Sequence, residues 1–324
     1  MNIGILGTGY AAPAKVLTNH DLEKIVETSD EWIQTRTGIR ERRIAEKGSA
    51  TSDWAVEACN KALENANATI DEIDLIVMGT TTPDQPLPSC ACIVQRALQA
   101  INATCFDVSA ACSGYIYALV TARHFLASGT YKKALVVGAD QISSFLDWTD
   151  RSTCVLFGDA AGASVLGEVS GRGIIASDIG SNGEYADLLC IPGGGSRNQS
   201  SAETVSNGAH YLKMNGAEVF KLAVRGMASS IERVLQESGI SIDQVACIIP
   251  HQANMRIIDA VAKRLNVSQD KLFINLDRYG NTSAASVIVA LSEAREKRRV
   301  VPGDIVLLTT FGAGLVWGST LIEI

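Results

Sequence analysis

The sequence lacks the long apolar runs and the excess positive charge that membrane-spanning and nucleic-acid-binding proteins require. No hydrophobic run approaches the roughly 20 residues needed to cross a bilayer, so we expect no membrane partner. Acidic residues outnumber basic ones by 35 to 28, and the net charge of -7 argues against nucleic acid as a partner. Residues 1–7 lead directly into a strand pattern without a basic segment or cleavage site, so we expect a cytoplasmic protein.

The cysteines lack the paired spacing of a zinc site, although there are eight of them. Only Cys90 and Cys92 lie close together, and no second pair completes a set of four ligands. Most cysteines lie in apolar segments, so we expect reduced thiols, no disulfide, no metal and no cofactor. A length of 324 residues with 47% hydrophobic residues is enough for one large globular domain or two joined halves.

One cysteine lies in a context that favours catalysis. Residues 105–108 read as a strand, residues 114–129 follow a helical pattern, and Cys112 lies in the small-residue turn between them. The nucleophile of many hydrolases occupies such a strand-to-helix turn. A helix N-terminus stabilises a thiolate, so we expect a lowered pKa for Cys112. The alternative is a buried core thiol, which is the commoner role of cysteine.

The order of predicted elements indicates an α/β protein. Strands are expected over 2–9, 73–78, 105–108, 134–137 and 158–166. Helices are expected over 21–28, 52–65 and 89–99, with a short helix after residue 29 that leads into a basic loop ending at residue 43.

The second half repeats this order at an offset of about 170 residues. The matching segments are 246–250 with 75–79, 273–276 with 105–108, 281–286 with the turn of Cys112, 286–298 with the helix after it, and 305–308 with 134–137. We therefore predict two α/β halves, residues 1–170 and 171–324, each with a buried and largely parallel sheet. The carboxyl ends of strands from both halves would then form one site.

That placement brings two further side chains toward Cys112. His251 directly follows the predicted strand 246–250, whereas the other three histidines lie in polar loops or within a helix. Asn281 lies in the turn that corresponds to the turn of Cys112. Without the repeat, His251 could equally be a buried structural imidazole and Asn281 a simple turn former. A glycine-rich loop at 309–318 could complete an oxyanion hole with its backbone N–H groups.

A set of Cys, His and Asn fits two chemistries. In papain-like proteases the Asn orients the His. In acyl-transferring enzymes, His and Asn both donate to a thioester oxygen and stabilise the enolate left when a malonyl group loses CO2. A duplicated α/β chain without disulfides favours the second chemistry.

The chain resembles the β-ketoacyl-[acyl-carrier-protein] synthase III family, the initiating condensing enzymes of bacterial fatty-acid synthesis, over its whole length. The resemblance rests on the motifs SDEWIQTRTGIRERR, DVSAACSGYIYAL, FGDAAGA, HYLKMNGAEVFK, PHQANMRI, YGNTSAASV and FGAGLVWGS. It implies a thiolase-like fold with five α-β-α-β-α layers and two mixed sheets. It also implies that an acyl-CoA primer acylates Cys112 and is then condensed with malonyl-acyl-carrier protein, with release of CoA, CO2 and β-ketoacyl-acyl-carrier protein.

The resemblance further implies roles for individual residues. The nucleophile would be Cys112, and His251 and Asn281 would promote decarboxylation. The backbone N–H groups of Cys112 and Ala313 would form the oxyanion hole. Coenzyme A would bind with its adenine between Trp32 and Arg151. The full set of residues that contact it would be Thr28, Trp32, Arg36, Arg151, Phe220 and Asn254. The acidic acyl-carrier protein would dock on one helix face, formed by Arg256, Lys263 and Arg264. The primer pocket of a homodimer would be lined by Leu87, Ile142 and Phe157.

Three positions depart from the family pattern. Leu87 stands where many relatives have Phe, which reaches across the dimer to close the neighbouring primer pocket, so the smaller side chain leaves the primer open between acetyl, branched and longer acyl groups. Ser152 replaces the common Gly after Arg151, and Trp148 is unusual. Two alternatives stay open. One is a secondary-metabolite enzyme with another primer or acyl acceptor. The other is a non-catalytic acyl-binding subunit, against which the presence of all three catalytic residues argues.

Overall fold

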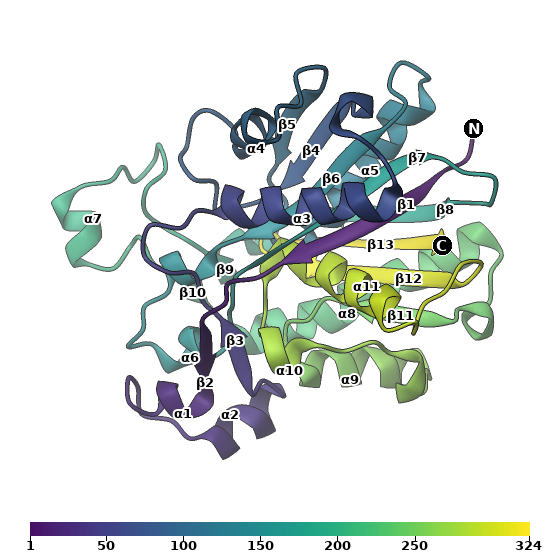
Figure 1. Cartoon of the computed structure of the whole chain (residues 1–324). Helices are drawn as coiled ribbons and strands as arrows, with labels where there is room; N and C mark the ends of the chain where they lie inside the picture. The colour runs from purple at the N-terminus through teal and green to yellow at the C-terminus, as the bar shows by residue number, and fades with distance from the viewer.

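Two mixed β-sheets packed with helices make up the chain, and the computed structural model describes all residues 1–324 (Figure 1). The strands of the first sheet span Ile3–Ala11 (β1), Leu75–Gly79 (β4), Thr104–Val108 (β5), Ala134–Asp140 (β6) and Ala160–Glu168 (β7). Those of the second span Ile174–Ser181 (β8), Cys247–Pro250 (β11), Ile305–Gly312 (β12) and Val316–Glu323 (β13). The longer helices span Thr51–Ala66 (α3), Cys90–Leu98 (α4), Gly114–Ala127 (α5), Gly216–Ser238 (α8), Met255–Arg264 (α9) and Ser286–Glu296 (α11).

Shorter elements connect these layers. Two small ladders pair Val16–Thr18 (β2) with Glu41–Arg43 (β3), and Leu189–Cys190 (β9) with Lys213–Met214 (β10). The short helices span Asn19–Leu22 (α1), Asp30–Thr37 (α2), Arg151–Cys154 (α6), Ala202–Ser206 (α7) and Leu276–Tyr279 (α10). None of the helices is both long and apolar enough to span a membrane.

Helices form three layers around the two sheets. Helices α3 and α4 pack on the outer face of the first sheet, and α8 and α9 pack on the outer face of the second. Helices α5 and α11 lie between the sheets, where the largest apolar cluster gathers side chains from both halves. The predicted five-layered α-β-α-β-α architecture is confirmed.

The central strands are mostly apolar because helices cover both faces of each sheet. All residues of β4 and of β6 are buried. The sheets are mixed, as predicted, but the parallel share is smaller than predicted, because β7 and β13 each run antiparallel to both neighbours. The parallel ladders join β4 to β5 and β6, and β11 to β12.

The repeat is visible in topology and in backbone conformation. The order β1-β7-β6-β4 of the first sheet corresponds to β8-β13-β12-β11 of the second. Helix α5 begins at Gly114 and α11 at Ser286, 172 residues later. Each follows a 3-10 turn whose first residue has a positive φ, 44° at Ala111 and 51° at Ser283. The same strand-to-helix turn is therefore built twice.

The register of the repeat shows which residues of the two turns correspond. With α5 aligned on α11, the counterpart of Cys112 is Ala284, and the counterpart of Asn281 is Ser109. Asn281 therefore lies in the repeated turn but is not the positional equivalent of Cys112.

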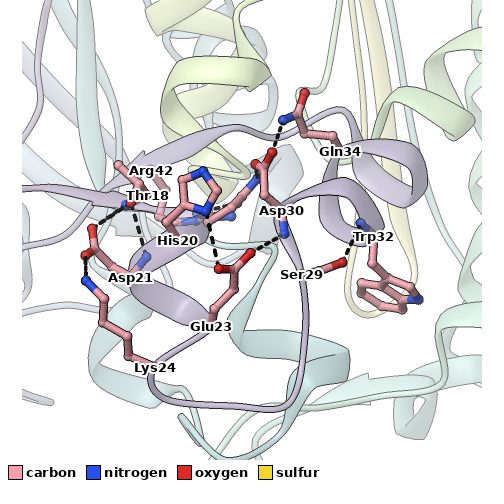
Figure 2. Close-up of polar contacts among 11 residues, drawn as sticks. Thr18, His20, Asp21, Glu23, Lys24, Ser29, Asp30, Trp32, Gln34 and Arg42 are labelled. Carbon is pink, nitrogen blue, oxygen red and sulfur yellow. Dashed lines mark hydrogen bonds and ion pairs between the residues drawn. The ribbon is translucent and has the colours of Figure 1, made fainter.

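The segment predicted as a helix over 21–28 forms only the single turn α1. The Glu23 carboxylate that follows accepts the N–H of Asp30 at 2.7 Å, which turns the chain into α2. Ser29 then caps α2 by accepting the N–H of Trp32 at 3.1 Å (Figure 2). The predicted helix after residue 29 is confirmed.

The sequence predicts a strand over 273–276, but none forms there, and the one bridge to β11 lies just before this segment, between Leu272 and Ile248. The side-chain oxygen of Gln252 accepts the N–H groups of Asn275 and Leu276 at 3.0 and 3.2 Å. These donors therefore do not join a strand ladder, and Leu276 begins α10.

The contact between the end of β4 and the start of α5 leads to a test of stability. A Cβ placed on Gly79 would overlap the backbone of Gly114. We expect Gly79→Ala to lower the free energy of unfolding by about 1–3 kcal/mol, because two buried backbone segments must move apart. Urea unfolding followed by circular dichroism measures the change. The control is Gly183→Ala, whose Cβ would meet nothing within 4 Å and which should stay within about 0.5 kcal/mol of wild type. Equal stability of the two variants would contradict the close packing.

Candidate active site

A cavity of about 570 Å³ contains all three residues predicted to be catalytic. Cys112, which follows β5, His251, which follows β11, and Asn281 line it together with mainly apolar side chains, among them Phe157 and Phe311. The structure therefore brings together three side chains that lie far apart in the sequence. Their elements meet where strands of both halves end, as the repeat predicted.

Cys112 lies in the 3-10 turn at the N-terminus of α5 and is only 7% exposed. The Ser283 hydroxyl donates to its sulfur at 3.5 Å. Gly312 packs so closely that a Cβ placed there would lie 2.7 Å from the Cys112 backbone nitrogen. Gly312 lines the cavity, whereas Ala313, the predicted oxyanion-hole residue, follows it and is not among the lining residues.

The predicted lowering of the Cys112 pKa is wrong. Burial raises the pKa of this thiol to about 12, and the Ser283 hydrogen bond offsets only part of that rise. The negative charge of Asp140 also raises it. The cost of removing water from the thiolate thus outweighs the stabilisation of the thiolate by the helix N-terminus. The side chain of Cys112 is therefore a neutral thiol.

His251 is held by a backbone bond and a side-chain bond. The backbone N–H of His251 donates to the carbonyl oxygen of Thr309 at 2.7 Å, which extends the β11–β12 ladder by one residue. Its Nδ1 lies 2.6 Å from the hydroxyl oxygen of Ser286, the first residue of α11. Burial lowers the pKa of His251 to about 3, so the imidazole is neutral at physiological pH and its second nitrogen, Nε2, is not bonded within the chain.

Two backbone hydrogen bonds hold Asn281 in place, one through its N–H and one through its carbonyl oxygen. Its N–H donates to Leu156 at 2.8 Å, and its carbonyl accepts the N–H of Gly158 at 3.0 Å. The side-chain oxygen of Asn281 accepts the N–H of Ser283 at 2.9 Å. The amide NH2 therefore has no partner within the chain and is available to a ligand in the cavity.

The cavity thus combines a thiol, a neutral imidazole and an amide donor within an apolar lining. A thiol can take up an acyl group. An imidazole and an amide that present N–H groups to the same oxygen can stabilise the negative charge of an enolate or tetrahedral intermediate.

Comparison with known proteins identifies the family. Two family profiles match the chain: 3-oxoacyl-[acyl-carrier-protein (ACP)] synthase III over residues 106–183, and the C-terminal part of the same family over residues 235–324. A β-ketoacyl-[acyl-carrier-protein] synthase III from Caldanaerobacter subterraneus subsp. tengcongensis is 53% identical over 321 residues, covering 99% of this chain and 97% of that protein. The chain belongs to the β-ketoacyl-[acyl-carrier-protein] synthase III family. It is an acyl-transferring condensing enzyme of the kind that initiates fatty-acid synthesis.

Solved structures of synthase III relatives agree. The 3-oxoacyl-[acyl-carrier-protein] synthase III of Aquifex aeolicus VF5 has a TM-score of 0.92 at 46% identity and covers 99% of this chain and 100% of that chain. The priming β-ketosynthase of the R1128 polyketide biosynthetic pathway has a TM-score of 0.92 at 34% identity, with 99% and 96% coverage. The thiolase-like fold of the synthase III family is thereby confirmed.

The remaining predicted residues fall inside and outside the cavity. Phe157, Phe220 and Asn254 line it, and so does Arg256, which we predicted for carrier-protein docking. Ile142 is buried in the same apolar cluster as Phe157 but is not a lining residue.

Trp32 and Arg151 contact each other outside the cavity. The guanidinium carbon of Arg151 lies 4.6 Å from the centre of the Trp32 ring, and Arg151 Nη1 donates to the carbonyl oxygen of Glu27 at 2.9 Å. Figure 2 shows the Trp32 ring pointing away from the polar cluster that joins α1 and α2. Arg36 is exposed one turn further along α2, and the buried hydroxyl of Thr28 has no hydrogen-bond partner.

The departures near Arg151 have modest structural consequences. The Ser152 hydroxyl donates to Asp150 at 2.7 Å, next to the N-terminus of the short helix α6 that carries Arg151. Trp148 is half-buried between two apolar clusters. Neither side chain lines the cavity.

Three residues of the site were not predicted from the sequence: Ser283, Ser286 and Gly312. All three lie in motifs that the sequence displays, YGNTSAASV and FGAGLVWGS. Small side chains carry no chemical signature of their own, so only their contacts with Cys112 and His251 reveal them.

The neutral state of His251 predicts a pH dependence of stability. The ordinary pKa is 6.5 and the folded value is about 3, so below pH 6.5 the unfolded chain binds a proton that the folded chain does not. The free energy of unfolding should therefore fall as pH drops, by about 3 kcal/mol from this group between pH 6.5 and pH 4.

The measurement is urea unfolding at several pH values, with His251→Asn as the comparison that retains every carboxylate. We expect wild type to lose more stability than the variant as pH falls. Parallel curves for the two proteins would show that His251 already carries its proton when folded.

Proposed function

We propose that Cys112 accepts the acyl group of an acyl-CoA primer, and that His251 and Asn281 stabilise the enolate formed when malonyl-acyl-carrier protein loses CO2. One observation carries this proposal: an apolar cavity is lined by a thiol, a neutral imidazole and an amide with unpaired N–H groups. An apolar lining limits the water that would hydrolyse a thioester or protonate an enolate.

The reaction has two stages. First, the Cys112 sulfur attacks the primer thioester, its proton passes to the departing CoA sulfur, and acyl-Cys112 forms. Second, the bond to the malonyl carboxylate breaks, CO2 leaves, and the electron pair becomes an enolate. The enolate carbon then attacks the acyl carbonyl, and the Cys112 thiolate departs and takes up a proton. We place each tetrahedral oxyanion against the N–H groups of Cys112 and Ala313, a placement supported by the close approach of Gly312 to Cys112.

Coenzyme A would reach the cavity from the surface that carries Trp32 and Arg151. The indole and the guanidinium already contact each other, so they would separate to enclose adenine, with Arg36 meeting a phosphate. The pantetheine arm would follow Thr28, Phe220 and Asn254. Two of these line the cavity, and the third offers an unpartnered hydroxyl.

Acyl-carrier protein would dock on the exposed face of α9. Arg256, Lys263 and Arg264 are all exposed there, and they form a local positive surface on a chain with a net charge of -7. Arg256 also lines the cavity, so this surface leads directly to the site.

A homodimer and a cytoplasmic location complete the proposal. Leu87 is 84% exposed and lies outside the cavity of its own chain. This exposure supports a role in the primer pocket of a partner subunit. All eight cysteines are free thiols, which supports a reducing compartment.

The similarity to a polyketide priming ketosynthase favours one alternative, a secondary-metabolite enzyme with a primer other than acetyl. It would use the same three residues, so the identity of the catalytic residues does not separate the two assignments.

The first experiment is intact mass after incubation with acetyl-, isobutyryl- and hexanoyl-CoA. We expect one acyl adduct on wild type and none on Cys112→Ala. Because Leu is smaller than the aromatic residue of many relatives, branched or longer primers should load on wild type. Leu87→Phe should shift the preference toward acetyl by about tenfold. An adduct on Cys112→Ala, or no adduct on wild type, would contradict the proposed nucleophile.

The second experiment tests the docking surface. The double variant Lys263→Glu, Arg264→Glu should raise the KM for malonyl-acyl-carrier protein by about tenfold at low salt, and the effect should shrink as salt increases. Acyl loading from acyl-CoA should be unchanged. The control with the same charge change, Lys47→Glu with Lys132→Glu, reverses two exposed charges elsewhere. If both double variants raise KM equally, the face of α9 has no specific role.

A further inference from the structure

The contact between His251 and Ser286 decides which imidazole nitrogen can act in the cavity. Nδ1 lies 2.6 Å from the Ser286 oxygen, and this is the only hydrogen bond that the Ser286 hydroxyl makes. Ser286 is 1% exposed and His251 is 4% exposed. Water therefore cannot readily replace this bond, and the proton between the two atoms belongs either to the hydroxyl or to Nδ1.

The two arrangements have opposite chemical consequences. If Nδ1 carries the proton and Ser286 accepts it, Nε2 has a lone pair and repels a developing oxyanion. If Ser286 donates, Nε2 carries the single proton of the neutral imidazole and can donate it to that oxyanion. Only the second arrangement gives an oxygen in the cavity two donors, one from His251 and one from the amide of Asn281.

The surroundings also disfavour a second proton on the ring. Burial is the one cause of the lowered pKa of His251, with no acidic side chain contributing to it. Ser286 is the first residue of α11, and the positive end of a helix opposes a positive imidazolium. A neutral imidazole carries one N–H proton, so its hydrogen-bond partner, the Ser286 hydroxyl, determines which ring nitrogen holds that proton.

We propose that the Ser286 hydroxyl donates to His251 Nδ1 and so holds the imidazole in the tautomer that presents N–H at Nε2 to the thioester oxygen. Ser286 is thus a positioning residue for decarboxylation, and it has no part in acyl loading. This inference rests on the proposed role of His251 in stabilising the enolate.

The chain offers a matched control for Ser286. Ser292 lies on the same helix, is 1% exposed, and has a buried hydroxyl without any hydrogen-bond partner. Ser292→Ala therefore removes the same atoms from the same environment without changing His251. Ser286→Thr keeps a hydroxyl at the tested position, whereas Ser286→Ala removes it.

The direct test is nitrogen NMR of protein labelled with 15N-histidine, with the His251 signals assigned from their loss in His251→Asn. Wild type, Ser286→Thr and Ser292→Ala should show a protonated Nε2 and an unprotonated Nδ1. Ser286→Ala should show both tautomers. A protonated Nδ1 in wild type would overturn the proposal, as would an unchanged tautomer in Ser286→Ala.

Kinetics separates this proposal from the proposed function. In Ser286→Ala, loading of Cys112 from acyl-CoA should stay at the wild-type rate, while CO2 release and condensation with malonyl-acyl-carrier protein should slow by about tenfold or more in kcat. Ser286→Thr and Ser292→Ala should condense at close to the wild-type rate. Equal losses in Ser286→Ala and Ser292→Ala would overturn the positioning role. If instead wild type fails to load, or His251→Asn releases CO2 normally, the proposed function itself fails.

Discussion

The site depends on the close packing of two helix N-termini between the sheets. The start of α5 carries Cys112, and the start of α11 follows the turn of Asn281. Ala284 lies where both meet, because a Cβ on Gly114 would be 3.1 Å from its side chain. Asp140, fully buried at the end of β6, accepts the N–H of Ala284 and, through its other oxygen, donors of Thr80, Thr81 and Thr82. One carboxylate thus joins the first half to the turn of the second, and side chains larger than glycine or alanine would separate the groups that we propose to be catalytic.

Burial then sets the protonation states of the groups that this packing assembles. The same loss of water raises the pKa of Cys112 and lowers the pKa of His251, so both groups are neutral. A thiolate–imidazolium pair, as in papain-like proteases, is therefore not the resting state. A neutral imidazole with so low a pKa is better suited to donate a hydrogen bond to an enolate than to act as a base. Because the ring carries a single proton, the nitrogen that holds it decides whether His251 can donate into the cavity. The role that we propose for the Ser286 hydroxyl follows from this loss of water.

Much of the fold could be predicted from the sequence, and specific local interactions explain where the prediction was wrong. The apolar strands, the helix after Cys112 and the repeated order all carry strong periodic signals. The helix expected over 21–28 stops after one turn because the Glu23 side chain bonds to Asp30. The strand expected over 273–276 does not form because Gln252 occupies its donors. Side-chain bonds of this kind replace backbone ladders without leaving a pattern in the sequence.

The sequence by itself determined the α/β class, the duplication, the family motifs and the three reactive residue types, because periodicity and residue chemistry are local properties. Tertiary structure alone decided that Gly312 lies on the wall of the cavity shared by Cys112, His251 and Asn281, and that Ser286 contacts His251 from behind that wall. It also reversed the expected direction of the Cys112 pKa, since the helix N-terminus is visible in the sequence but the exclusion of water is not. The solvent exposure of Cys112 and the partner of the Ser286 hydroxyl, 35 residues away at His251, depend on segments that meet only once the chain has folded.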